Sequence, residues 1–524
     1  MLIKIILLVI FFAVTVGVGI YCRKKATDVN GFVLGGRSVG PWLTAFAFGT
    51  SYFSAVIFVG YAGQFGWNFG VASTWIGLGN ALIGSLMAWV VLGRRTRLLT
   101  QKLNSRTMPD FFGLRFGSSL LKILASVIVF VFLIPYTASL FNGLSRLFTM
   151  AFPGIDYAVC VIVMAALTGV YVIVGGYMAT AVNDFIQGII MLGGIVAVIV
   201  AVLSQNGGFT GSLIKLAQVE SVTSSGEVME GGFASFFGPD PTFLLVVVLL
   251  TSLGTWGLPQ MVGKFYAIRD EASVRKGTII STLFAVVVAG GCYFIGGFGR
   301  IFTTQSAVDA EGFDSIIPTM LAGLPDLLIA VVLVLVLSAS MSTLSSLVLT
   351  SGSTLTLDLI VPAMGQKATE KKKMLIMRVL IAVFIVISAV IAIVQAKSKV
   401  VFIAQLMGVS WGALAGAFLA PFLYGLFWKK VTRVAVAANF VCGVGISVIQ
   451  LVKSLTGFTF GVEFLDNVMF KTSLHSGVFA MLLGLVLVPL ISVLTKKSCP
   501  TGVDEMFSCY DAQVVSKAKK SLGE

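Results

Sequence analysis

The stretch Leu337-Ser-Ala-Ser-Met-Ser-Thr-Leu-Ser-Ser-Leu347 decides the fold class, because it places six hydroxyl side chains inside an apolar run typical of a membrane helix. Those side chains are Ser338, Ser340, Ser342, Thr343, Ser345 and Ser346. Hydroxyl oxygens offer lone pairs without charge, and hard cations bind sets of oxygen ligands. Helical spacing puts Ser342, Ser345 and Ser346 on one face. Such a face predicts either hydrogen bonding between helices or an ion site.

The composition around this stretch indicates an all-α polytopic membrane protein. Of 524 residues, 57% are hydrophobic and 11% are charged, and the mean hydropathy is +1.01. A soluble domain has about 25% charged residues. Apolar segments of about 20 residues, each long enough to cross a bilayer, recur along the chain. We predict about thirteen spans, near residues 2–22, 41–66, 72–93, 120–148, 156–175, 184–204, 241–262, 278–302, 327–357, 375–396, 400–428, 434–453 and 474–495.

The basic residues predict how these spans are oriented. Lys and Arg gather after most odd-numbered spans, and the cluster after the seventh is Lys264, Arg269, Arg275 and Lys276. Most of the charged residues in loops 205–240 and 303–326 are Asp and Glu. Because basic loops stay in the cytoplasm, we expect an outer N-terminus and a cytoplasmic C-terminus in the plasma membrane. The excess of 36 Lys and Arg over 22 Asp and Glu then faces anionic lipid, not nucleic acid.

Other classes of function find little support. Six scattered cysteines and the single His475 show no metal-ligand spacing and no disulfide framework. No phosphate-binding G-x-x-x-x-G-K-[ST] loop occurs. We therefore expect no organic cofactor and no enzymatic activity. The open alternative is a membrane sensor or receptor on the same fold, which would require a signalling domain beyond Thr495. We expect a monomer.

Two predicted spans are interrupted at equivalent places. Residues 47–55 read Ala-Phe-Gly-Thr-Ser-Tyr-Phe-Ser-Ala, and residues 252–260 read Ser-Leu-Gly-Thr-Trp-Gly-Leu-Pro-Gln. Gly and Pro free backbone groups that lipid does not satisfy, so such breaks line cavities. Spans two and seven are five apart, as in transporters built from two inverted repeats of five helices. The domains expected are an N-terminal helix and basic loop (1–40), repeat one (41–204), an outer loop (205–240), repeat two (241–428), two peripheral helices (429–495) and a cytoplasmic tail (496–524).

Five segments together resemble the sodium:solute symporter family over residues 28 to 435. They are Phe32–Gly40, Thr107–Phe116, Val174–Gln187, Met341–Ser345 and Gly425–Lys430. The resemblance implies a LeuT-like core of five plus five helices with broken first and sixth core helices. It also implies Na⁺ as coupling ion, import of a small polar organic solute, and alternating access.

The resemblance also implies cation sites. One Na⁺ would lie between the broken first core helix and the eighth, held by backbone carbonyls of Thr50, Phe53 and Ala339 and by the hydroxyls of Ser342 and Thr343. Some members hold a second Na⁺, here matched by Asp184, Ser342, Ser345 and Ser346. The alternatives are hydroxyls that only bond the carbonyl four residues earlier, and an Asp184 placed by a helix dipole.

The solute is expected between the two breaks, near the middle of the membrane. Candidate residues, each of which could instead serve packing, are Tyr52, Ser54, Tyr136, Trp256, Gln260 and Gln405. Tyr52 and Val56 stand where the proline branch has an acidic residue and a tryptophan, and Ile57 is apolar where the sugar branch is polar. An amino acid, a carboxylate or vitamin, a sialic acid and a sugar all stay open.

Overall fold

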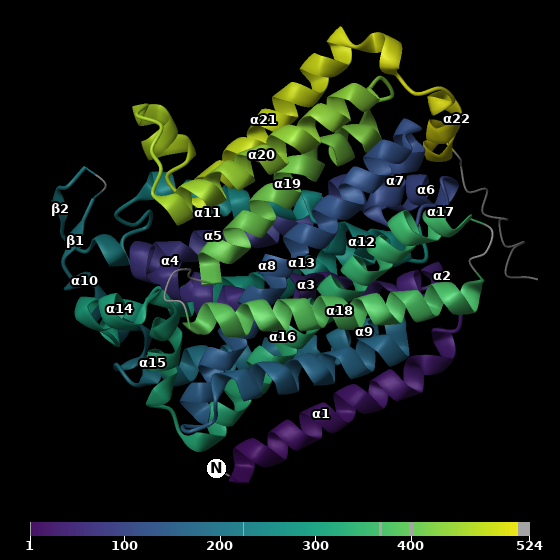
Figure 1. The fold of residues 1–524 in the computed structure, drawn as a ribbon. Helices are drawn as coiled ribbons and strands as arrows, with labels where there is room; N and C mark the ends of the chain where they lie inside the picture. Colours follow the sequence, from purple (N-terminus) through teal and green to yellow (C-terminus); the bar gives the residue numbers. More distant parts are fainter. Residues whose placement is uncertain (1, 224, 366–368, 398–402, 512–524) are drawn as a thin grey trace, which may run out of the picture.

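The computed structural model describes residues 2–223, 225–365, 369–397 and 403–511, and helices fill most of them. The long helices run roughly side by side (Figure 1). In the described ranges, ten helices are long and apolar enough to cross a membrane, or eleven if one bent pair is a single span. Nine of the ten correspond to α1 (Leu2–Cys22), α8 (Ser119–Ala151), α9 (Tyr157–Ser204), α13 (Glu271–Gly296), α16 (Asp326–Thr354), α18 (Glu370–Lys397), α19 (Ile403–Phe427), α20 (Arg433–Thr456) and α21 (Ser473–Leu494), and the tenth is the segment Val56–Lys102.

Short elements gather at the two ends of this bundle (Figure 1). One end carries α2 (Val29–Leu34), α6 (Arg94–Lys102), α7 (Met108–Phe116), α17 (Val361–Met364) and α22 (Val503–Phe507). The opposite end carries α10 (Gly208–Ala217), α14 (Gln305–Glu311), α15 (Ile316–Ala322) and the antiparallel pair β1 (Ser221–Val222) and β2 (Val228–Met229). The predicted loop 205–240 thus contains a helix and a hairpin. Part of the predicted tail, residues 512–524, lies outside the described residues.

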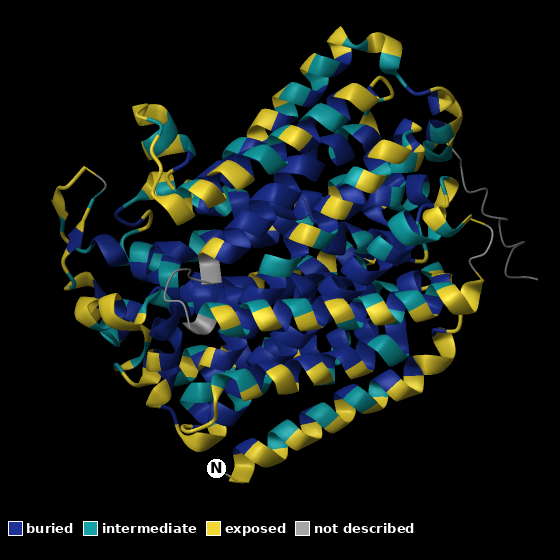
Figure 2. Ribbon diagram, in the orientation of Figure 1, coloured by how far each residue is buried: buried dark blue, intermediate teal, exposed yellow. Residues whose placement is uncertain are grey.

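The surface of the bundle is apolar, as a lipid-facing surface requires. The outer helices α1, α18, α20 and α21 alternate exposed and covered residues, whereas the centre is buried (Figure 2). Exposed apolar side chains on these helices include Val9, Val383, Val441 and Val486. Because lipid tails are as apolar as these side chains, helices associate in the membrane mainly through packing and polar contacts. Polar groups therefore collect inside the bundle.

Backbone breaks interrupt two helices inside the bundle. α3 (Pro41–Tyr52) ends where Phe53 becomes extended (φ −105°, ψ 110°), and the chain continues through the π-helix Val56–Tyr61 into α4 (Ala62–Phe69). α11 (Pro241–Leu253) continues through a 3₁₀ turn, Gly254–Gly257, and bends by 46° into α12 (Pro259–Ala267). Pro259 opens α12, where its missing N–H costs no helical hydrogen bond. Both breaks coincide with the Gly- and Pro-containing stretches noted in the sequence.

Two segments are long enough to cross a membrane twice. α9 has 48 residues, about 72 Å of helix against about 30 Å of bilayer core. It turns at Gly176, whose φ is +56° and where a Cβ would lie 2.8 Å from the Phe32 carbonyl oxygen. Only glycine satisfies both conditions. Val56–Lys102 is similarly long and includes α5 (Thr74–Gly79). The two predicted spans at 156–175 and 184–204 therefore meet at this kink, without a loop.

Candidate functional site

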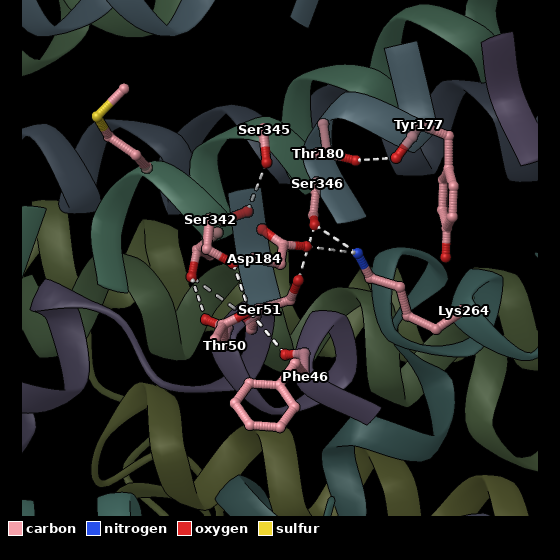
Figure 3. Close-up of polar contacts among 12 residues, drawn as sticks. Phe46, Thr50, Ser51, Tyr177, Thr180, Asp184, Lys264, Ser342, Ser345 and Ser346 are labelled. Atoms are coloured by element: carbon pink, nitrogen blue, oxygen red, sulfur yellow. Dashed lines mark hydrogen bonds and ion pairs between the residues drawn. The ribbon is translucent and has the colours of Figure 1, made fainter. Parts of the chain in front are cut away.

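The end of α3 meets the hydroxyl-rich part of α16. Ser342 Oγ donates to Thr50 Oγ1 over 2.7 Å. Thr343 Oγ1 lies 3.3 Å from the Thr50 carbonyl oxygen, 3.4 Å from that of Ser51 and 3.1 Å from that of Ala339. The last carbonyls of a helix lack intrahelical partners. Because α3 ends at Tyr52, the carbonyl oxygens of Thr50 and Ser51 are available to Thr343. Figure 3 shows Thr50, Ser51 and Ser342 turned toward one another.

Four of the five residues predicted for the first cation site thus lie together: Thr50, Ala339, Ser342 and Thr343. All four are buried. Phe53 is the residue at which α3 ends, and it lines a small cavity with Ala339. The cluster consists of uncharged oxygens, a chemistry suited to a hard monovalent cation.

A second polar cluster lies beside the first and contains a cation of the chain itself. Ser346 Oγ lies 2.7 Å from Ser51 Oγ and accepts a hydrogen bond from Lys264 Nζ over 2.8 Å. The same Nζ forms an ion pair with Asp184 at 3.7 Å. Figure 3 shows the ammonium of Lys264 between Asp184 and Ser346. Ser345 instead donates to the Ser342 carbonyl, over 2.8 Å within α16.

The prediction that Lys264 lies in a cytoplasmic loop was wrong. Lys264 belongs to α12, and its side chain is 4% exposed. α12 continues inside the bundle after Pro259, and the carboxylate of Asp184 compensates the desolvated ammonium. Counting basic residues along the sequence does not distinguish such a lysine from a loop residue.

A pocket opens from this second cluster toward the end of the bundle that carries α2 and α7. The space within it that is open to the centre of a water molecule is about 50 Å³. Its lining includes Arg106, Tyr177, Gln260, Lys264, Ser346 and Thr350. Solvent at that end therefore reaches the edge of the polar cluster. Gln260, predicted for the solute, belongs to this pocket and is 2% exposed.

The predicted solute residues divide into two groups. Tyr52 and Tyr136 are fully buried, and Trp411 on α19 packs near both, with ring centroids 6.1 Å from Tyr52 and 6.0 Å from Tyr136. Tyr52 also stacks on Phe53 at 4.5 Å and donates to the Thr251 carbonyl. No local pattern indicated Trp411, because it lies in an ordinary apolar run.

The remaining candidates have other contacts. Trp256 Nε1 donates to the Ile83 carbonyl over 3.0 Å. Ser54 Oγ accepts from the Val56 amide over 3.2 Å and lines the same small cavity as Phe53 and Ala339. Gln405 is exposed, near the beginning of α19, and its carbonyl accepts from Ser473.

Asp184 is not the only carboxylate buried in the bundle, which the sequence pattern alone did not indicate. Asp358, in the π-helix Leu355–Ile360, accepts a hydrogen bond from Thr107 and lies 3.3 Å from Lys122 Nζ. Lys122 also pairs with Asp110 at 2.6 Å. These contacts join α7, α8 and the end of α16. In the described ranges, no group of three His, Cys, Asp or Glu residues could hold a metal ion.

Comparison with known proteins connects this geometry with a family. The model of the sodium:solute symporter family matches residues 32–442. The chain belongs to the sodium:solute symporter family. It is therefore a Na⁺-coupled solute symporter of the membrane, and its family and relatives are transporters rather than enzymes.

Relatives and solved structures of transporters resemble the chain over most of its length. It is 28% identical over 485 residues to the osmoregulated proline transporter OpuE of Bacillus subtilis, covering 91% of this chain and 94% of the relative. It is 30% identical to sodium/proline symporter 2 of Staphylococcus saprophyticus, covering 85% and 86%.

The fold is similar to that of a Na⁺-coupled sialic acid symporter, with a TM-score of 0.72, 16% identity and coverage of 94% and 98%. It is also similar to the nucleobase-cation-symport transporter Mhp1, with a TM-score of 0.53, 13% identity and coverage of 91% and 98%. At these identities the likeness concerns the fold alone, and both neighbours have the LeuT fold.

Proposed function

We propose that this symporter binds its coupling Na⁺ between α3 and α16, at Thr50, Phe53, Ala339, Ser342 and Thr343. The observation that carries the proposal is the approach of Ser342 and Thr343 to the end of α3 at Thr50, within 2.7 to 3.3 Å. A Na⁺ ion would replace these hydrogen bonds by coordination from the same oxygens. The breaks after Tyr52 and at Leu258 support a core of five plus five helices with interrupted first and sixth core helices.

The solute that we propose is a small polar organic molecule, with proline as the first compound to test. The relatives named as proline transporters support this choice. The solute site would include Tyr52, Ser54, Tyr136, Trp256, Gln260 and Gln405, together with Trp411. Aromatic side chains with one polar tip suit a small solute that is part apolar and part polar.

We further propose that the protein is a monomer in the plasma membrane, with its N-terminus outside. It would import its solute by alternating access. The basic residues that follow most odd-numbered spans support this orientation. Inward movement of one Na⁺ supplies about 2.3 kcal/mol per 100 mV of membrane potential, in addition to the concentration gradient. That free energy allows uphill uptake.

The test is uptake into proteoliposomes with an imposed Na⁺ gradient. Radiolabelled proline is used first, then a panel of amino acids, carboxylates and sugars. We expect saturable accumulation that disappears when choline replaces Na⁺. The double variant Ser342→Ala/Thr343→Ala should abolish Na⁺-stimulated uptake while the protein still reaches the membrane. Unchanged Na⁺ dependence in that variant would remove the site assignment.

A further inference from the structure

Lys264 is the buried charge that the first cation site leaves unexplained. Its ammonium lies 2.8 Å from Ser346 Oγ and 3.7 Å from Asp184 Oδ2, and it faces the Tyr177 ring at 5.5 Å. The side chains of Lys264 and Asp184 are 4% and 0% exposed. A lysine held this way inside a membrane bundle requires a specific reason, because uncompensated charge is costly there.

The position of the ammonium coincides with a site where a cation is expected. Asp184 and Ser346 are two of the four residues matched to a second Na⁺, and Lys264 Nζ lies between them (Figure 3). The other two residues have partners of their own in the bundle. Ser342 donates to Thr50, and Ser345 donates to the Ser342 carbonyl.

Charge balance favours one cation here rather than two. Asp184 supplies one negative charge, and the ammonium of Lys264 compensates it. Adding a Na⁺ beside that ammonium would put two positive charges next to one carboxylate in a medium of low dielectric constant, where like charges repel strongly. The first site differs in charge, because its oxygens come from uncharged hydroxyls and carbonyls.

We propose that Lys264 is the resident cation of the second site, so that the protein binds and moves a single Na⁺, at the α3–α16 site. This inference rests on the proposed function and specifies its stoichiometry. In it Lys264 is a specificity-determining residue. Its ammonium supplies the charge that Asp184 would otherwise take from a second Na⁺, and its hydrogen bond to Ser346 keeps α12 against α16.

The test counts Na⁺ ions bound to purified protein and needs no knowledge of the solute. Radioactive Na⁺ is the probe, and the readout is the number of ions bound at saturation. We expect one ion for the wild type. Lys264→Met, which keeps length and removes charge, should bind two. The double variant Asp184→Asn/Lys264→Met removes both charges and should return to one. Lys453→Met, at an ion pair with Asp466 remote from α16 in the sequence, is the matched control and should bind one.

Two ions in the wild type would overturn the inference while leaving Na⁺ coupling intact. One ion in folded Lys264→Met would also overturn it, as would loss of all Na⁺ binding in the double variant. If Lys264→Met does not fold, the numbers of Na⁺ ions bound by the wild type and by the double variant test the inference. Failure of the proposed first site gives a different result, because Ser342→Ala/Thr343→Ala would then bind as many ions as the wild type.

Discussion

Among the single residues, the hydroxyls of α16 illustrate how a side chain acquires its role. Ser340 and Ser345 donate to carbonyls of their own helix, the local alternative open to any serine in a helix. Ser342 and Thr343 reach α3, and Ser346 meets Ser51 and Lys264. Similar residues within seven positions thus serve either the helix or the site, according to which direction each faces.

We expect Thr50→Val to weaken Na⁺ activation of uptake by about five-fold, because the loss of one buried hydrogen-bonding partner costs about 1 kcal/mol. Valine keeps the shape of the side chain but removes the hydroxyl that faces Ser342. The measurement is the Na⁺ concentration that gives half-maximal uptake. Thr15→Val is the control, since that buried hydroxyl bonds only the Phe11 carbonyl in its own helix. An unchanged Na⁺ dependence in Thr50→Val would show that the contact between this hydroxyl and Ser342 does not support Na⁺ binding.

Among the elements, α4 and α13 approach each other closely through their backbones. This contact holds in place the segment that follows the break after α3. A Cβ on Gly66 of α4 would lie 2.0 Å from the Gly296 carbonyl oxygen, and a Cβ on Gly296 would lie 2.1 Å from that of Ala62. Small residues permit such approach between membrane helices. The chain beyond Ser54 is therefore fixed to α13.

Gly66→Ala should destabilise the protein by about 1 to 3 kcal/mol, the usual cost of overpacking, because backbone rather than a flexible side chain blocks the added methyl group. Thermal unfolding of the purified protein in detergent measures this as a lower midpoint. Gly17→Ala on α1 is the control, as its Cβ would meet nothing within 4 Å. Equal unfolding midpoints for the two variants would show that the close contact of α4 with α13 does not contribute to the stability of the protein.

In the whole molecule, the two polar clusters differ in how far solvent reaches them. The pocket that reaches Lys264 and Ser346 opens at the end with α2 and α7. The cluster of Thr50, Ala339, Ser342 and Thr343, which we propose holds Na⁺, is itself buried. A carrier with alternating access populates several such states, and a ligand shifts their populations in proportion to its differential affinity.

We expect Na⁺ to lower the rate at which a thiol reagent modifies Thr350→Cys, made in a variant whose six native cysteines are replaced. Thr350 lines the pocket, and Na⁺ binding between α3 and α16 should favour states in which this entrance is closed. The rate is measured on inside-out vesicles in Na⁺ and in choline. Gln101→Cys, exposed on α6 at the same end, should react equally in both. A rate for Thr350→Cys that Na⁺ leaves unchanged would contradict the coupling.

The local sequence by itself determined the membrane class, the positions of the helix interruptions and the face of α16 that carries hydroxyls. It could do so because hydrophobic length, Gly and Pro backbone preferences and helical spacing act within about 20 residues. Only the tertiary structure decided that Lys264 pairs with Asp184, that Trp411 packs near both Tyr52 and Tyr136, and that α9 turns at Gly176 against Phe32. These contacts join residues far apart in the chain, so no local pattern specifies them.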